Sequence, residues 1–207
     1  MLSIVIPAYN EQHQIGFIVS EAKPFADELV VVDDGSIDET ASIAEQHGAR
    51  VIRQANSGHK TALKKGIQEA NGDICLTMDA DGEHDPWDIP RLVAPIEAGK
   101  ADLVLGKRTY VARPSERIIS FFTWLKTGVK DTGTGMRAMR TDLARRLTLP
   151  GRCICGTSVL EAHHLGARIQ EVPIHLRMVN KPRKVAWEHA VQLFHVLGWI
   201  VKVGNKQ

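Results

Sequence analysis

The stretch that most constrains the fold is ICLTMDAD at residues 74–81, an apolar run that ends in two aspartates separated by one residue. An earlier stretch, LVVVDD at residues 29–34, has the same form. Short apolar runs of this kind indicate buried strands. In an open α/β sheet, ligands bind beyond the carboxyl ends of the strands, so acids supplied by two strands can face one bound molecule. The two stretches therefore predict an acidic ligand site and make the chain an enzyme candidate.

The order of the elements predicts an α/β fold. Apolar runs alternate with helix-like segments over the first hundred residues, which favours a mostly parallel central sheet flanked by helices. The predicted strands are 3–6, 29–33, 50–53, 74–79 and 103–106, and the helices between them are 12–23, 39–47, 60–70 and 87–97. The second half is less regular, with helices predicted at 115–127, 157–165 and 185–203 and a strand at 169–174. Ser36 and Glu39 fit a capping box for the helix 39–47.

Length and charge favour one compact domain. A chain of 207 residues with 43% hydrophobic content can bury a core but is short for two ordinary domains. We expect residues 1–184 to form a catalytic domain and residues 185–207 to form a C-terminal amphipathic helix. The 26 Lys and Arg residues nearly balance the 24 Asp and Glu residues, so the net charge gives no case for a nucleic-acid partner.

Several sequence features predict a cytoplasmic protein. No apolar run reaches the ~18 residues that a membrane span needs, and the N-terminal residues lack the pattern of a secretion signal. The three cysteines are too few for a complete disulfide framework, which favours a reducing compartment. Cys153 and Cys155 lie near His163 and His164, but this spacing matches none of the usual zinc patterns.

Asp79 and Asp81 predict a metal site. Residues i and i+2 of a strand point to the same side, so the two carboxylates can face one cation. Mg²⁺ is held by one or two protein carboxylates while substrate phosphates and water complete its shell. A nucleoside diphosphate is therefore the expected ligand, and Glu83 is a further metal-ligand candidate. The alternatives are turn chemistry for the aspartates and a solvated loop acid for Glu83.

Five motifs occur in the order and approximate spacing of one large enzyme family: PAYNE at 7–11, VDDGSIDET at 32–40, NSG at 56–58, DAD at 79–81 and GKR at 106–108. In these motifs the chain resembles the family 2 glycosyltransferases. The motifs DTGTGMR at 131–137 and EVPI at 171–174, followed by Arg177, resemble the polyprenyl-phosphate (dolichol-phosphate) mannosyltransferase and glucosyltransferase branch. The resemblance extends from residue 3 to about residue 185.

This resemblance implies a GT-A fold, a nucleotide-sugar donor such as GDP-mannose or UDP-glucose, and Mg²⁺ or Mn²⁺. It places Asp79 and Asp81, the DxD motif, at the metal and diphosphate. The residues that it assigns to the donor are Pro7, Ala8, Asn10, Glu11, Asp33, Asp34 and Asp79. Similar proteins usually have Lys-Gly after Asn-x-Gly, whereas Gly58 is followed here by His59 and Lys60. Lys60 is accordingly either a phosphate contact or an exposed lysine at a helix start.

Basic residues of the second half predict an acceptor phosphate site, because arginine's planar fork suits phosphate oxygens. The predicted set is Arg108, Arg137, Arg177, Lys181, Arg183 and Lys184. The alternative is a solvated basic surface, which is stronger for Lys181 and Lys184. Similar proteins often carry Gly-x-Ser-Lys near residues 180–184, and its absence here leaves the acceptor open.

The expected reaction inverts the anomeric carbon, because the acceptor attacks opposite the departing diphosphate, whose charge the metal neutralises. A hydroxyl acceptor needs a general base, for which Glu161 is the candidate, whereas a phosphate oxygen is already anionic. The expected catalytic residues are Asp81, Arg108, Arg137 and Glu161. The predicted function is hexosyl transfer from a nucleotide sugar to polyprenyl phosphate, with a saccharide or other hydroxyl acceptor as the alternative.

The last predicted helix indicates a membrane-surface location. Its apolar residues recur every three or four positions: Trp187, Val191, Phe194, Leu197 and Val201. Such a helix with basic flanks can lie in a lipid headgroup layer, which predicts a peripheral protein at the cytosolic membrane face. The alternatives are packing on the sheet or in a homo-oligomer, and a separate membrane anchor. A Rossmann oxidoreductase is excluded, because PAYNE occupies the place of its glycine-rich turn.

Overall fold

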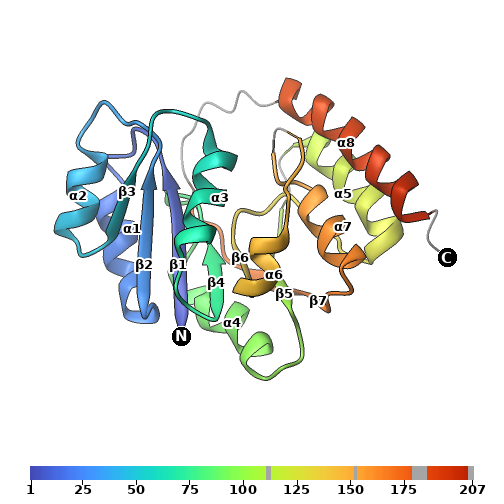
Figure 1. Cartoon of the computed structure of the whole chain (residues 1–207), viewed down its shortest axis with the longest axis horizontal. Coiled ribbons are helices and arrows are strands. Elements are labelled where there is room, and N and C mark those ends of the chain that lie inside the picture. The colour runs from blue at the N-terminus through green and yellow to red at the C-terminus, as the bar shows by residue number, and fades with distance from the viewer. Residues whose placement is uncertain (111–112, 152, 179–185, 205–207) are drawn as a thin grey trace.

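The computed structural model describes residues 1–110, 113–151, 153–178 and 186–204. Its described part contains one seven-stranded sheet in the order β3-β2-β1-β4-β6-β5-β7 (Figure 1). The strands are β1 (Leu2–Ala8), β2 (Glu28–Asp33), β3 (Arg50–Arg53), β4 (Ile74–Thr77), β5 (Leu103–Arg108), β6 (Arg137–Arg140) and β7 (Ile169–Ile174). The helices are α1 (Ile15–Ala22), α2 (Thr40–Gln46), α3 (His59–Glu69), α4 (Ile89–Glu97), α5 (Pro114–Thr127), α6 (Thr141–Arg146), α7 (Thr157–His164) and α8 (Ala186–Gly204). Short 3₁₀ turns cover Lys23–Phe25 and Pro86–Asp88.

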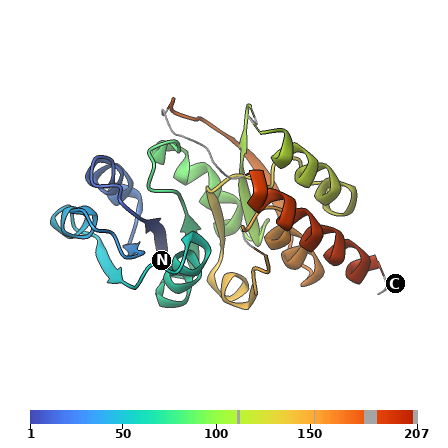
Figure 2. The same ribbon diagram turned by 90° about the horizontal axis from the view of Figure 1, so that it is seen from above.

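The central strands are buried on both faces, which explains their nearly continuous apolar sequence. Along β1, Ile4 and Ile6 pack in the core that holds α1 and α4, while Val5 packs in the core that holds α3. Figure 2 shows helices on both sides of the sheet. The strands β1, β2, β3 and β4 pair in parallel, so their carboxyl ends meet at one edge. The predicted α/β architecture is confirmed.

One strand runs against this pattern. β6 is antiparallel to both β4 and β5 and lies between them. Neither β6 nor the short helix α6 is among the sequence-predicted elements, because the four residues RAMR carry two arginines and lack a strand-like apolar run. The backbone hydrogen bonds of so short a segment are made with the neighbouring strands β4 and β5. β6 brings the loop 131–136 to the carboxyl end of β4.

A third apolar cluster joins α5, α7 and α8 through Ile119, Leu160 and Val196. The buried face of α8 also includes His189 and Gln192. Phe194 and Leu197 point away from this cluster and are exposed. No helix in the described residues is long and apolar enough to cross a membrane. Lys181, Arg183 and Lys184 lie outside the described residues, as do the side chains of Trp187 and Val201.

The predicted capping box at α2 is wrong. α2 begins at Thr40, whose amide donates to the Asp38 carboxylate at 3.0 Å. The Ser36 hydroxyl instead accepts a hydrogen bond from the Asn10 amide at 3.0 Å. Asp38 therefore takes the local capping role, and Ser36 ties two loops together at the edge of the sheet.

Candidate functional site

A cleft of about 600 Å³ opens at the carboxyl ends of β1, β2 and β4. One wall comes from the first half of the chain and comprises Pro7, Ala8, Tyr9, Glu11, Asp34, Asn56, Gly58, His59, Ala62, Asp79, Ala80 and Asp81. The opposite wall comes from the second half and comprises Arg113, Glu116, Gly133, Thr134, Gly135, Cys153, Ile154, Cys155 and His189. For the roles that are proposed for them below, we call these the donor wall and the acceptor wall.

Asp34 organises the donor wall. Its buried carboxylate accepts hydrogen bonds from the amides of Ser57 and Gly58 at 2.9 and 2.8 Å, and from the Gln54 side chain at 2.7 Å. Asp33 accepts from the Ser36 amide at 3.2 Å and is not among the cleft-lining residues. The two adjacent acids therefore have different places: Asp34 faces the cleft while holding the loop 54–58, and Asp33 supports the turn after β2.

The loop after β1 is tied to the loop after β2. Asn10 has a positive φ of 54°, a conformation that Asn tolerates better than most residues. Its side-chain oxygen accepts from the Ile37 amide at 3.0 Å, and the Glu11 amide donates to the Thr40 hydroxyl at 2.8 Å. Pro7, Ala8 and Glu11 line the cleft as predicted, whereas Asn10 shapes the loop beside it.

The carboxylates of Asp79 and Asp81 both line the cleft. Asp79 lies 3.2 Å from the His59 ring nitrogen and accepts its hydrogen bond when that nitrogen is protonated. Burial opposes ionisation of Asp79, but the charges of His59, His84 and Arg137 outweigh it and lower its pKa. Asp81 accepts from the Glu83 amide at 2.9 Å. Two carboxylates that line one cleft fit a hard divalent cation such as Mg²⁺ or Mn²⁺.

Gly135 explains part of the DTGTGMR motif. A Cβ atom at this position would collide with the Asp79 carboxylate, so glycine lets the loop pass this close to that side chain. The loop that follows Asp131 thus packs directly on Asp79.

Of the two residues that replace the usual Lys-Gly, His59 rather than Lys60 lines the cleft. The Lys60 ammonium donates to the Gly151 carbonyl, so its position supports neither the phosphate contact nor the freely exposed lysine that the sequence left open. His59 lines the cleft instead. Desolvation at the cleft disfavours its protonation although 55% of its side chain is exposed, and the hydrogen bond and charge of Asp79 outweigh this and raise its pKa.

Glu83 and Arg177 lie outside the cleft lining. The backbone carbonyl of Glu83 accepts from the Arg177 amide at 2.8 Å. The Arg177 side chain forms ion pairs with Glu21 at 2.6 Å and Asp85 at 3.0 Å and lies over the Phe17 ring. The predicted acceptor contact of Arg177 is therefore corrected: this arginine joins α1 to the segment after β7. Because Glu83 is not among the cleft-lining residues, its position does not support the predicted role as a metal ligand.

Arg108 is engaged by two buried acids. Its guanidinium donates to Asp131 at 2.8 and 2.9 Å and to Glu116 at 2.8 Å. Burial works against its charge, but the two carboxylates outweigh it and raise the pKa of Arg108. The predicted contact with an acceptor phosphate is corrected, because the structure uses this side chain to connect β5, α5 and the loop at Asp131.

Arg137 is buried, with only 1% of its surface exposed. Its donors go to the carbonyls of Thr132, Thr134 and Ile154 and to the Ser158 hydroxyl. A guanidinium held on all sides in this way cannot reach a ligand without local unfolding. Its predicted catalytic contact is corrected to a role in shaping the loop that packs on Asp79.

Glu161 is also buried, and it does not line the cleft. Its carboxylate accepts from the Thr148 amide and hydroxyl at 2.8 and 2.7 Å and from the Leu149 amide at 3.1 Å. Leu149 has a positive φ of 53°, a strained conformation for a leucine. The predicted general-base role is corrected: Glu161 stabilises this strained turn.

Sequence reasoning missed most of the acceptor wall. Arg113 precedes α5 and pairs with Glu116 at 2.7 Å, with 30% of its side chain exposed. Its Nε atom is buried and has no hydrogen-bond partner among the residues that the structure describes. Arg113 lies in no recognisable motif, so only its place in the fold reveals it.

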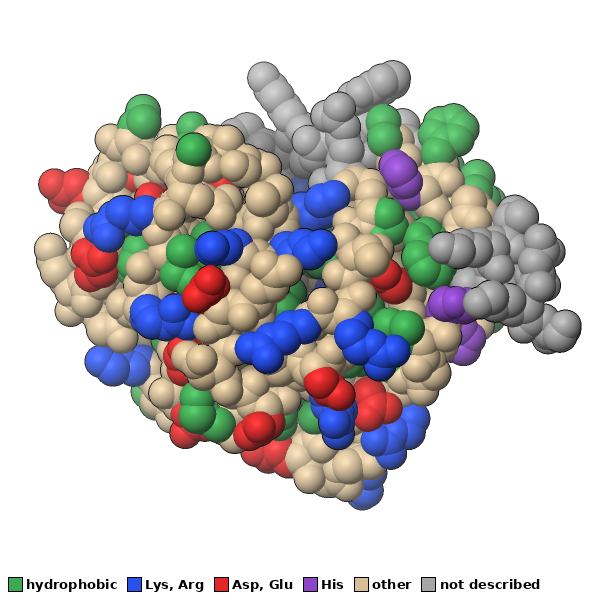
Figure 3. Space-filling model, viewed as in Figure 1, with side chains coloured by type: hydrophobic (Ala, Val, Ile, Leu, Met, Phe, Trp, Pro, Cys, Tyr) green, Lys and Arg blue, Asp and Glu red, His purple; other side chains and the backbone are tan. Residues whose placement is uncertain are grey.

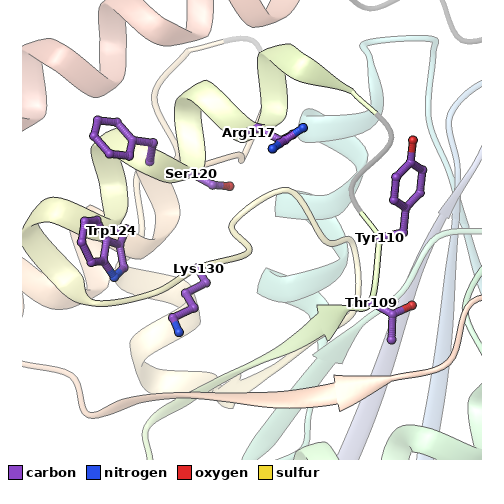
Figure 4. Close-up of a pocket in the computed structure, with 7 residues that line it drawn as sticks. Thr109, Tyr110, Arg117, Ser120, Trp124 and Lys130 are labelled. Carbon is purple, nitrogen blue, oxygen red and sulfur yellow. The ribbon is translucent and has the colours of Figure 1, made fainter.

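A second hollow of about 580 Å³ lies beside α5. Its lining comprises Thr109, Tyr110, Arg117, Ser120, Phe121, Trp124 and Lys130. Figure 4 shows the aromatic side chains and the basic Arg117 and Lys130 around this hollow. The hollow is therefore apolar with cationic groups at its margin.

Comparison with known proteins adds to this geometry. The model of glycosyl transferase family 2 matches residues 3–149. An uncharacterized protein of Methanocaldococcus jannaschii is 32% identical over 192 residues, covering 83% of this chain and 79% of that protein. The dodecaprenyl-phosphate galacturonate synthase of Rhizobium johnstonii is 31% identical, with 72% of this chain aligned. The match spans 51% of that synthase, about half of its length.

The fold has solved counterparts. Glucosyl-3-phosphoglycerate synthase from Mycobacterium tuberculosis, crystallised with phosphoglyceric acid, superposes with a TM-score of 0.79 and 25% identity. The superposition covers 98% of this chain and 79% of the synthase. The same enzyme has been crystallised with Mn²⁺ and UDP-glucose. These likenesses confirm the predicted GT-A fold.

Proposed function

The chain belongs to glycosyltransferase family 2, and we propose that it is a metal-dependent inverting enzyme that transfers a hexose from a nucleotide sugar to a polyprenyl phosphate. The observation that carries this proposal is a single cleft with the Asp79 and Asp81 pair on one wall and Arg113 on the other. The donor and acceptor thus have separate walls with suitable charges. Curated relatives named for transfer to polyprenyl phosphate support the choice of acceptor.

The donor wall suits a nucleotide sugar. Pro7, Ala8 and Glu11 lie beside Asp34 at the ends of β1 and β2, where ribose hydroxyls can donate to carboxylates. Asp79 and Asp81 would hold Mg²⁺ or Mn²⁺, which when bound neutralises the charge of the departing diphosphate. Through that ion the two carboxylates would hold the diphosphate in the cleft.

Arg113 is the candidate for binding the acceptor phosphate, in place of Arg108 and Arg137. Arg113 lines the cleft, and its side chain is 30% exposed while it pairs with Glu116. A phosphate oxygen in the cleft can accept a charge-assisted hydrogen bond from the exposed part of this guanidinium. The engagement of Glu161 elsewhere also favours a phosphate acceptor, because a hydroxyl nucleophile would lose its predicted base.

An exposed apolar surface lies beside the second hollow. On α5, Ile118, Phe121, Trp124 and Leu125 are between 44% and 56% exposed, and on α8 Phe194 is 78% exposed. Figure 3 shows apolar side chains gathered over the α8 side of the molecule. We propose that this surface and its Arg117 and Lys130 margin contact the lipid chain and headgroup layer, which places the enzyme at a membrane surface.

A radiolabel transfer assay tests the proposed function. Purified protein is incubated with GDP-mannose or UDP-glucose, with Mg²⁺ or Mn²⁺, and with a polyprenyl phosphate acceptor. We expect metal-dependent transfer of label into the lipid phase, which Asp81→Ala abolishes. Arg113→Ala should raise the KM for polyprenyl phosphate by 10-fold or more while leaving nucleotide-sugar binding unchanged, since only the acceptor contact is removed.

Arg140→Ala is the matched control for Arg113→Ala. Arg140 also pairs with a nearby acid, Asp142, but it lies on the surface and is not among the cleft-lining residues. Its replacement should leave transfer unchanged. If nucleotide sugar binds and no lipid is labelled, the polyprenyl-phosphate assignment fails, and labelled saccharide acceptors become the next test.

A further inference from the structure

Two cysteines and a histidine meet on the acceptor wall. The sulfur atoms of Cys153 and Cys155 and a ring nitrogen of His189 all lie within 4.8 Å of one another. Around a tetrahedral zinc ion with Zn–S bonds of about 2.3 Å, neighbouring ligand atoms are about 3.8 Å apart. A shift of about 1 Å would therefore close these three atoms around one ion.

We propose that Cys153, Cys155 and His189 form a binding site for a borderline-soft divalent metal ion of the Zn²⁺ class. Sulfur and imidazole ligands select such ions, whereas Mg²⁺ and Mn²⁺ prefer the oxygen ligands of Asp79 and Asp81. The described residues supply three ligands, and all three line the cleft. With three protein ligands, a bound ion would keep a fourth position for water or an anion, as in zinc sites that take part in chemistry.

The histidine is already oriented for this role. The Ser115 hydroxyl lies 2.8 Å from Nδ1 of His189, which leaves Nε2 for the metal. Metal-bound histidines usually have their second ring nitrogen held by such a partner, which fixes the ring orientation. Ser115 lies on α5 and His189 on α8, so the contact also sets the relative position of these helices.

The cysteine loop is held by a neighbouring residue of α8. The Gln192 side chain accepts from the Cys153 amide at 3.2 Å and donates to the Cys155 carbonyl at 3.1 Å. The Cys155 amide also lies 3.4 Å from the sulfur of Cys153. The backbone that carries both thiols is therefore attached to α8, three residues from His189. Such preorganisation lowers the cost of binding an ion.

Arg137 lies beside this cluster and is fully buried, with donors to the carbonyls of Thr132 and Thr134 and to the Ser158 hydroxyl. A buried cation favours anionic groups nearby.

The histidines nearest in sequence do not join this cluster. His164 packs edge-on against the Trp199 ring at 5.8 Å, and His163 is exposed. His189 reaches the cysteines from a helix more than thirty residues further along the chain. The sequence spacing therefore matches no usual zinc pattern, although the fold brings Cys153, Cys155 and His189 together.

Zinc content of the full-length chain tests this proposal. The protein is kept reduced, stripped with a chelator, dialysed against Zn²⁺ in excess Mg²⁺, and analysed by elemental mass spectrometry. We expect about one zinc per chain in the unmodified protein and in Asp81→Asn. Cys153→Ser and His189→Gln should each weaken zinc binding by 10-fold or more. Cys75→Ala, which removes the buried cysteine of β4, is the matched control and should retain the metal.

Absorption spectroscopy of the Co²⁺-loaded protein provides a second test, which does not depend on the folding of any variant. Tetrahedral Co²⁺ bound to thiolates gives strong visible bands and sulfur-to-metal charge-transfer absorption, and we expect both in the unmodified protein. Substoichiometric zinc without these bands would overturn the proposal. So would retention of zinc by both Cys153→Ser and His189→Gln, or its loss in Asp81→Asn. These outcomes do not depend on sugar transfer, so they are distinct from failure of the proposed function.

Discussion

The charged motif residues of the two halves of the chain have different surroundings. On the donor wall, Asp79 and Asp81 line the cleft, and the hydrogen bonds that they accept leave them facing it. In the second half of the chain, Arg108 and Arg137 have buried guanidiniums whose donors are taken by the protein itself. A charged residue in a motif can therefore either meet the substrate or hold the loop that does. Its hydrogen-bond partners decide which.

The largest expected effect tests the structural role of Arg108. Arg108→Met leaves Asp131 and Glu116 buried without their shared cation, which should cost about 3–5 kcal/mol of unfolding free energy. Urea unfolding at neutral pH measures this. Arg53→Met, which removes an exposed pair with Glu45, is the control and should cause no measurable change. Unchanged stability with lost sugar transfer would break the comparison, because Arg108 would then be a substrate contact.

A smaller effect is expected for Glu161. Glu161→Gln replaces one acceptor oxygen with an amide that cannot accept from Thr148 and Leu149 together, so we expect a loss of about 1–3 kcal/mol in stability. The value of kcat should stay within about twofold at a temperature where both proteins are folded, whereas loss of a general base costs about 10²-fold or more. Thermal unfolding and transfer assays on the same samples separate the two roles. A collapse of kcat at unchanged Tm would restore Glu161 as the base.

The smallest effect concerns an ion pair far from the cleft. Hydrogen bonds from Arg168 lower the pKa of Asp102 to about 2. Because the folded-state pKa lies below the unfolded value of about 3.9, the pair stabilises the protein above about pH 4, and this contribution is lost as the pH falls towards 2. Solvent screening limits it to at most about 1 kcal/mol. Unfolding of the unmodified protein and Asp102→Asn between pH 2 and 6 should show a stability difference that disappears at the acid end. A constant difference would show that Asp102 acts through packing.

The donor wall could be predicted because its signals are local. Strands β1, β2 and β4 are apolar runs that end in polar motifs, and parallel strands bring those ends together wherever the connections are helical. Pro7, Ala8, Glu11, Asp34, Asp79 and Asp81 all line the cleft as expected. Asn10 and Asp33 are not among the cleft-lining residues, because their side chains accept hydrogen bonds from the adjacent turns.

The acceptor wall could not be predicted in the same way. β6 is too short to show a pattern, and Arg113 and His189 lie outside the motifs. The motif residues Arg108 and Arg137 carry the same guanidinium group that an arginine of a ligand site carries, so residue type alone cannot separate the two roles. Burial and hydrogen-bond partners separate them, and both depend on segments distant in sequence.

The sequence by itself determined the α/β class, the parallel strands and the acidic edge at Asp79 and Asp81, because hydrophobic periodicity and strand-end motifs are properties of neighbouring residues. Tertiary structure alone decided that Arg108 and Glu161 pair with groups of the protein itself, that Arg113 lines the cleft, and that His189 meets Cys153 and Cys155. The physical reason is that a charge acquires its role from the groups that surround it. Those groups come together only when the chain packs.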